Sequence, residues 1–363
     1  MTGRMVASGL VSLTIRESGM RNLSVISLIC VLLGWGCTPS EMQNRYISLS
    51  ATVGELSADS ELMTKADADP SSLAAAKPFT GSPAVNRPLD VAIWLSDQKG
   101  VYSKNPNPQA PTYLPCVTSV SYNGSASKDI WTPDGRNMLT YPLPSDETTA
   151  AAPVYCVGFY PQSNWNIEDS GTSASHIIDG SEDLMFSKQM TGSYEQNFGQ
   201  QKFEHLLTWV KVNLSTTSLR AAEIWGPVEY LKVVTPNQKV DITFSDPNQI
   251  EYTGGPKEIS LALPEPPELS ITTRTFGQVF CAPPVKDSEG NLGYTVKVKT
   301  ANLSEKEVFV KLLQGDYTTP IESADYAVGK LFVINLRFND IAVLEGVCTL
   351  VQWDNQNSNI YLK

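Results

Sequence analysis

The sequence is poor in the residues from which catalytic and metal sites are built. It contains two histidines, His176 and His205, in 363 residues, and neither has the cysteine pair or acidic spacing of the usual zinc sites. Gly-x-Ser-x-Gly, phosphate-loop and dinucleotide-binding motifs are absent. Glu182 and Asp183 are adjacent and would diverge on a strand, so they do not indicate a glycosidase pair. We therefore expect neither a cofactor nor an enzyme activity.

Clusters of basic residues are also missing. The chain has 27 Lys+Arg and 38 Asp+Glu, a net charge of −11. Without Arg4, Arg16, Glu17 and Arg21 of the first 36 residues, the balance is 24 − 37 = −13. An acidic chain with scattered cations argues against binding to nucleic acid and against electrostatic attachment to anionic lipid.

Helical periodicity is nearly absent, and alternation of apolar and polar residues dominates. Ile47, Leu49, Ala51 and Val53, for example, alternate with hydroxyl-bearing residues. The run 154–160 is apolar throughout, which is typical of a strand covered on both faces. The sequence predicts an all-β fold of sandwiches with one short helix at 219–225. Strands are expected at 47–53, 91–95, 154–160, 210–214, 240–244, 294–298, 308–312, 331–338 and 347–353.

Two stretches have the composition of linkers. Residues 66–86 are rich in Ala, Ser and Pro, and residues 246–267 are rich in turn-forming residues. We place the main domain boundary in the second stretch, near residue 250. The prediction is an N-terminal β-sandwich domain over 37–249, with its first strand at 46–53, and a C-terminal β-sandwich domain over 250–363.

An apolar run over 23–34 precedes Cys37. It has about the length of a signal-peptide core and is shorter than a membrane-spanning helix. Met20 and Arg21 give this run a charged start, so residues 1–36 are expected to be a signal region, with 1–19 an untranslated upstream extension. A cysteine after a small residue at the end of such a run resembles the lipobox of bacterial lipoproteins, where the thiol is lipidated and the preceding peptide removed. The alternative is an ordinary signal peptide with an incidental cysteine.

Four cysteines follow Cys37 in the chain: Cys116, Cys156, Cys281 and Cys348. In an exported protein they could pair as 116–156 and 281–348, one disulfide in each half. None has the Cys-x-x-Cys spacing of metal or redox sites. The alternative, of equal weight, is that they are buried free thiols in strands.

Other polar and aromatic residues have a structural and a functional interpretation. His205 begins a strand and is expected to be a hydrogen-bonded histidine at the edge of the core rather than a general base. The segment Asp179–Asp183 is expected to be a capped turn, because it lacks the ligand spacing of a calcium loop. Trp131, Trp165 and Trp225 could form a sugar-binding platform, although tryptophans in a β-sandwich more often lie in the core.

The order of five segments resembles the fimbrillins of Bacteroidetes, the Mfa-like and FimA-like pilins. Pro153–Pro161 resembles their central strand with its Tyr-Pro end, and Ile178–Met185 and Phe203–Val212 follow it in the same order. Val333–Asp340 and Val347–Asp354 resemble the closing strands with their near-terminal tryptophan. The resemblance spans roughly residues 85–355.

The resemblance implies two transthyretin-like β-sandwich domains in tandem and a role as a type V pilus subunit. Such subunits are exported through the periplasm to the outer membrane as lipoproteins, which makes Cys37 the lipidation site, with acyl chains such as palmitate. A trypsin-like surface protease then removes the first strand, here with Ile47, Leu49, Ala51 and Val53. A strand of another fimbrial subunit takes its position, which yields a fimbrium with a role in adhesion to host or bacterial surfaces.

The basic residues near the first strand define the expected cleavage sites. Lys65 is the first basic residue after the strand and is the favoured site; Arg45 and Arg87 are alternatives. Pro88 would hinder cleavage after Arg87, and cleavage after Arg45 would leave the strand in place. The end 359–363 is short for a donor strand, so a shaft, tip or anchor position stays open. The alternative function is a monomeric surface lipoprotein that binds glycans.

Overall fold

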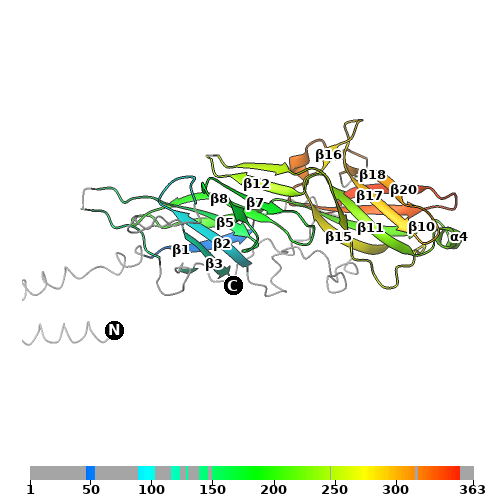
Figure 1. Cartoon of the computed structure of the whole chain (residues 1–363), viewed down its shortest axis with the longest axis horizontal. Coiled ribbons are helices and arrows are strands. Elements are labelled where there is room, and N and C mark those ends of the chain that lie inside the picture. The colour runs from blue at the N-terminus through cyan, green and yellow to red at the C-terminus, as the bar shows by residue number, and fades with distance from the viewer. Residues whose placement is uncertain are drawn as a thin grey trace, which may run out of the picture. The chain divides into compact units, whose positions relative to one another are not determined.

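The computed structural model divides the chain into two compact units, Met1–Tyr46 and Ile47–Lys363. All strands and helices discussed below belong to the second unit. The structure describes residues 46–53, 89–102, 116–122, 128–129, 139–145, 149–245, 247–314 and 318–351. Among the described residues, the regular secondary structure is almost entirely β-strand (Figure 1), which confirms the all-β prediction.

A seven-stranded sheet contains the first strands of the chain. Its order is β3-β2-β5-β8-β9-β1-β4. Neighbouring strands are antiparallel except for β1 and β9, which are parallel. The strands are β1 (Ser48–Val53), β2 (Leu89–Ser96), β3 (Cys116–Tyr122), β4 (Lys128–Asp129), β5 (Val154–Tyr160), β8 (Met185–Gly192) and β9 (Gln200–His205).

A four-stranded sheet of order β13-β12-β7-β6 lies across from it. Buried residues from both sheets form one cluster, with Trp94 and Phe159 from the larger sheet and Val240 and Ile242 from the smaller. Two sheets that share buried faces in this way form a sandwich. The strands are β6 (Asn166–Ile167), β7 (Ser173–Ile177), β12 (Lys239–Thr243) and β13 (Gln249–Thr253).

A nine-stranded sheet contains all the remaining strands of the described residues. Its order is β14-β11-β17-β18-β20-β19-β10-β15, with β16 paired to β17. β18 and β20 pair at only two positions, Leu312 with Cys348 and Leu313 with Thr349. The strands are β10 (Thr208–Thr216), β11 (Val228–Thr235), β14 (Lys257–Ser260), β15 (Arg274–Cys281), β16 (Val285–Lys286), β17 (Leu292–Thr300), β18 (Lys306–Leu313), β19 (Leu331–Phe338) and β20 (Leu344–Val351).

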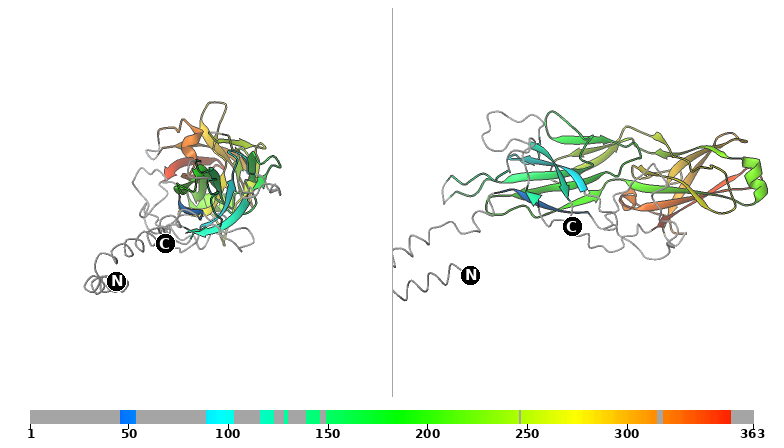
Figure 2. Two further views of the ribbon diagram at one scale, coloured as in Figure 1. Left: turned by 90° about the vertical axis from the view of Figure 1, so that its left-hand side faces the viewer. Right: turned by 90° about the horizontal axis from the view of Figure 1, so that it is seen from below.

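The predicted short helix is confirmed as α4 (Leu219–Trp225). Ser218 begins it, because its hydroxyl accepts a hydrogen bond from the Ala221 N–H at 3.0 Å. Gly226, with φ of 70°, ends it. The right-hand view of Figure 2 shows α4 as the short green helix beside the strand ends. A 3₁₀ helix, η3 (Ala324–Ala327), precedes β19.

The stretch 246–267 is not a linker, contrary to the prediction. It contains β13 and β14, which pair with β12 and β11. Sheet membership also does not follow chain order: β10 and β11 belong to the nine-stranded sheet, whereas β12 and β13 return to the four-stranded sheet. The predicted boundary near residue 250 separates two folding domains. Sheet membership alone does not show where one folding domain ends, so this boundary stays a prediction.

Candidate functional site

β1 occupies a buried position close to one edge of the seven-stranded sheet. The side chains of Ile47 and Leu49 are fully buried in a cluster with Val91, Ile93 and Phe203. The Ile47 N–H donates to the Leu139 carbonyl at 2.8 Å. The strand that the sequence predicts at 47–53 is thereby confirmed as β1. The side chains of Ala51 and Val53 lie outside the description.

β1 is connected to the sheet by short ladders. It pairs with β9 at four parallel positions, from Ser50 with Gln200 to Val53 with Phe203. On its other side it pairs with β4 at two positions. Because β1 is the first strand in the chain, a single cut between it and Leu89 at the start of β2 would leave it bound by noncovalent contacts alone.

Polar side chains bind the first half of β1. We call Ser48, Asn197 and Tyr141 the Ser48 cluster. Asn197 Nδ2 donates to Ser48 Oγ at 2.7 Å, and the Tyr141 hydroxyl donates to Asn197 Oδ1 at 2.6 Å. That hydroxyl also accepts from the Phe198 N–H at 3.0 Å. Burial raises the pKa of Tyr141 well above its ordinary value, so the phenol keeps its proton and remains a donor.

A buried glutamine lies beside the second half of β1. Gln201 of β9 is fully buried, and its neighbours Gln200 and Lys202 are exposed. Its Nε2 lies 3.4 Å from Cys156 Sγ. Gly158 leaves the space that this side chain and Phe203 fill, because a Cβ there would lie 2.9 Å from Gln201 Nε2. We call the surroundings of β1, namely its neighbour β9 together with Asn197 and Tyr141, the β1 groove.

Neither disulfide that the sequence could form is present: Cys281 and Cys348 are buried free cysteines, and Cys116 lies too far from Cys156. The backbone register gives the reason for the first pair: Cys116 and Cys156 both pair with Leu95, from opposite sides. Their Cα atoms are thus separated by two strand spacings, about 9–10 Å, beyond the roughly 7 Å limit for a disulfide.

For the second pair, β10 and β19 lie between β15, which carries Cys281, and β20, which carries Cys348. Burial raises the pKa of both thiols, which disfavours the reactive thiolate. These two cysteines are core residues of the nine-stranded sheet.

Both histidines are buried, and His205 is the last residue of β9 rather than the first residue of a strand. His205 Nδ1 lies 2.8 Å from Asp183 Oδ2, and both side chains are almost fully buried. His176 Nδ1 lies 2.7 Å from the Ile177 carbonyl. In the part of the chain that the structure describes, no group of three or more His, Cys, Asp and Glu could hold a metal ion.

The predicted capped turn at Asp179–Asp183 is confirmed. Asp179 Oδ1 accepts hydrogen bonds from the Ser181 N–H and hydroxyl, both at 2.8 Å. Gly180 has a φ of 89°, and its carbonyl accepts from the Phe280 N–H of β15 at 2.9 Å. A Cβ at Gly180 would lie 2.5 Å from Val279, so both the backbone angle and this contact require glycine.

The tryptophan platform is wrong for the two members that the structure describes. Trp165 is 9% exposed and donates its Nε1–H to the Pro161 carbonyl at 3.0 Å. Trp225 is 1% exposed and donates to the Asn339 carbonyl at 2.9 Å. Both belong to hydrophobic clusters, so neither offers a ring face to a sugar. Trp131 lies outside the described residues.

Several predicted site residues also lie outside the described residues: Cys37, Arg45, Lys65 and Arg87. No helix within the described ranges is long and apolar enough to cross a membrane. Sequence reasoning missed Asn197, Tyr141 and Gln201. No local pattern marks them, because all three lie more than 90 residues from Ser48 of β1 in the chain, and the Tyr141 hydroxyl reaches Ser48 through Asn197.

Comparisons with known proteins give a likeness of structure only. No family model and no curated protein matches the sequence. A solved candidate cell adhesion protein from Bacteroides uniformis is similar, with a TM-score of 0.46, 12% identity, and coverage of 79% of this chain and 100% of that chain. A candidate cell adhesion protein from Bacteroides ovatus gives a TM-score of 0.44 and 13% identity, with coverage of 86% of this chain and 99% of that chain.

A candidate polysaccharide binding protein from Bacteroides thetaiotaomicron is also similar. It gives a TM-score of 0.41 and 7% identity, with coverage of 75% of this chain and 91% of that chain. At these identities and TM-scores no residue role is transferred from any of the three structures.

Proposed function

We propose that the protein is a structural subunit of a surface fimbrium, exported as a lipoprotein and polymerised by strand exchange. The observation that carries the proposal is the placement of β1. It is the first strand, it lies near a sheet edge, and it fills the core with Ile47 and Leu49. A strand with these properties can be removed by one cut and replaced by a strand of another chain.

Loss of β1 would create a strong binding site for an extended segment. The four ladder positions on β9 would lose hydrogen bonds that contribute roughly 0.5–1.5 kcal/mol each. The two buried aliphatic side chains contribute about 1.5–3 kcal/mol each. These contributions are a large share of a typical domain stability of about 5–15 kcal/mol. A replacement strand would regain them by β-augmentation.

The proposed processing follows from the order of segments in the chain. Cleavage at Lys65 or Arg87 separates β1 from β2, whereas cleavage at Arg45 removes only the segment before β1. The proposed lipid anchor on Cys37 would leave together with β1 after the first two cuts. Partners in this scheme are a trypsin-like protease, the outer membrane and other fimbrial subunits, with surface adhesion as the outcome.

The test is limited proteolysis of the purified 37–363 chain with trypsin. N-terminal sequencing is expected to give a new start at Ala66, and the trimmed protein is expected to form multimers that resist heating in detergent. A Lys65→Gln, Arg87→Gln variant is the matched control, because it keeps β1 attached and should stay monomeric. A trimmed protein that remains monomeric at high concentration would contradict the proposal.

A further inference from the structure

Gln201 is a residue of the β1 groove whose side chain is incompletely bonded. The residue is 0% exposed, and its Oε1 has no hydrogen-bond partner among the described residues. Its Nε2 has only the thiol of Cys156 nearby, at 3.4 Å. A buried amide oxygen without a donor is unfavourable, because it has lost water and gained no partner.

The position opposite Gln201 on β1 is Ala51. Side chains of directly opposed residues in a sheet lie about 5 Å apart when they share a face. Residue 51 falls on the face defined by Ile47 and Leu49, because side chains alternate along a strand. Alanine has no hydrogen-bond donor, so β1 itself has no side chain at this position that could bond the amide oxygen.

The other end of β1 provides a contrast within the same groove. There, Ser48 accepts the hydrogen bond that Asn197 offers, and Asn197 is in turn bonded by Tyr141. The groove therefore contains two polar positions, 48 and 51 in the register of β1. β1 has a hydrogen-bonding side chain, Ser48, at the first position. It has none at the second, where Ala51 lies opposite Gln201.

We propose that Gln201 determines which strand the β1 groove prefers, by favouring a partner strand with serine or another short hydrogen-bond donor opposite it. Such a strand keeps the aliphatic residues of positions 47 and 49 and adds a donor at position 51. The inference rests on the proposed strand exchange and gives it a direction, because the replacement strand bonds a group that β1 leaves unbonded. The partner is an extended segment of another protein chain.

The first test is a double-mutant cycle in the uncut 37–363 chain. Ala51→Ser is expected to raise the midpoint of thermal unfolding by about 2–4 °C when Gln201 is present. In the Gln201→Met background, which keeps the shape but removes the amide, Ala51→Ser is expected to lower the midpoint. An equal effect of Ala51→Ser in both backgrounds would overturn the inference. Gln201→Leu serves as the background if Gln201→Met does not fold.

The second test uses trypsin-trimmed protein and synthetic peptides of residues 46–53. The Ala51→Ser peptide is expected to bind about fivefold more tightly than the native peptide, the effect of one added buried hydrogen bond. An Ala51→Thr and Ala51→Val pair controls for size, because the two differ only in the hydroxyl. Equal affinities of the serine-substituted and native peptides would overturn the inference.

The two tests separate the inference from the proposed function. Coupling between positions 51 and 201 in the uncut chain supports the inference even when trimmed protein forms no multimers, a result that would refute strand exchange alone. Multimers without any coupling would support strand exchange and overturn the role of Gln201.

Discussion

Two parallel strand pairs in this protein differ in length and in position. β1 and β9 pair at four positions, and β1 has only the two-residue β4 on its other side. β10 and β19 pair at eight positions, and each has a second long partner, β15 and β20. The first pair involves a strand that a single cut can detach, whereas the second pair lies in the middle of its sheet.

The two pairs also differ in how they use the core. β19 contributes to two hydrophobic clusters at once: Leu331 and Val333 belong to the cluster of the sandwich, and Phe332 and Ile334 belong to that of the nine-stranded sheet. β1 contributes Ile47 and Leu49 to a third cluster. A strand with buried residues on both faces packs against two cores, so its loss would disrupt both.

The largest effect is expected from truncation in the central pair. Phe332→Ala removes a fully buried ring of β19 and should cost about 3–5 kcal/mol of unfolding free energy. Chemical denaturation of the 37–363 chain measures it. Ile341→Ala is the control, because Ile341 is 78% exposed and should change little. Comparable losses in the two variants would contradict the central role of β19.

A smaller and more local effect is expected in the peripheral pair. Leu49→Ala should cost about 2–5 kcal/mol, because it leaves a cavity in the cluster beneath β1. Hydrogen exchange followed by mass spectrometry should show faster exchange in β9, with β10 and β19 unchanged. Equal acceleration in all three strands would remove the distinction between the two pairs.

The sequence predicts strands far better than it predicts their pairing. Alternation identified β10, β12 and β17, because buried and less buried side chains alternate along most of each strand. It also identified β1 and β2, although β2 is buried on both faces over residues 91–96. It missed β7 and β8, whose Ser-, His- and Lys-containing sequences have no clear period of two. It misread 246–267 as a linker, because turn residues there separate two short strands.

The site was predictable in part. The alternation in Ile47–Val53 predicted an inserted strand, since a strand with one apolar face must cover a core. The β1 groove was not predictable. Asn197 and Ser48 are 149 residues apart in the chain, and β9 is polar except for Phe203, so it shows no apolar alternation. Contacts of such sequence separation leave no local pattern.

Two asparagines, one beside each parallel strand pair, test whether the β1–β9 pair is held independently of the β10–β19 pair. Asn197 bonds Ser48 of β1, and Asn213 of β10 bonds Asn335 of β19 through Nδ2 at 3.1 Å. Asn197→Ala removes the bonds to Ser48, Tyr141 and the Phe198 N–H, and Asn213→Ala removes those to Asn335 and Thr275. Each change should cost about 1–3 kcal/mol. Only Asn197→Ala is expected to speed release of β1 after trypsin cleavage, measured by size-exclusion chromatography. Faster release in the Asn213→Ala variant would show that the pairs are coupled.

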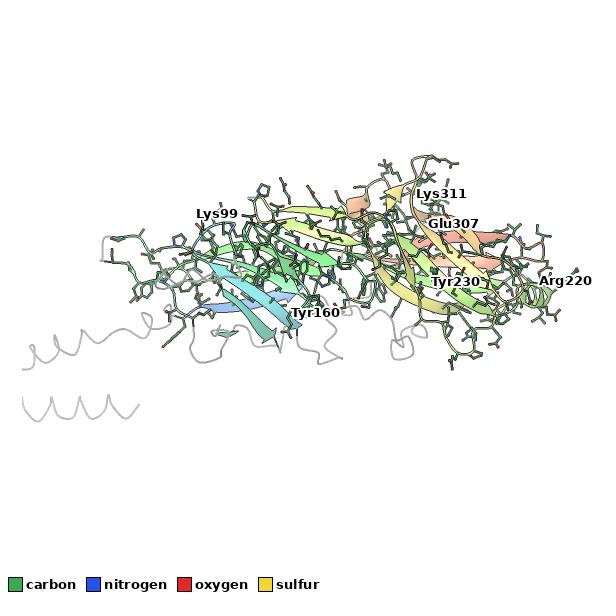
Figure 3. All side chains as sticks on the ribbon, in the orientation of Figure 1. Lys99, Tyr160, Arg220, Tyr230, Glu307 and Lys311 are labelled. Atoms are coloured by element: carbon green, nitrogen blue, oxygen red, sulfur yellow. The ribbon has the colours of Figure 1, made fainter. Side chains whose placement is uncertain are left out.

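The smallest effect is expected on the charged face of the nine-stranded sheet, part of which Figure 3 marks with Tyr230 and Glu307. Lys232 lies 2.8 Å and Lys297 2.9 Å from the Glu258 carboxylate. Hydrogen bonds from these two lysines lower the pKa of Glu258 from 4.5 to about 2. A depressed pKa means that the contribution to stability is present above pH 4.5 and is lost as the pH falls toward 2.

This face is exposed, so water screens the ion pairs and their contribution is small. Glu258→Gln should therefore lower the thermal midpoint slightly at pH 7 and by less at pH 2, where about half of the wild-type carboxylate is protonated. Added salt should shrink the difference at pH 7. The Ser48 cluster contains no acid, so the effect of Asn197→Ala should be the same at pH 7 and at pH 4. An acid-dependent effect of Asn197→Ala would mean that the electrostatics of the nine-stranded sheet reach the β1 groove, and β1 would then not be an independent element.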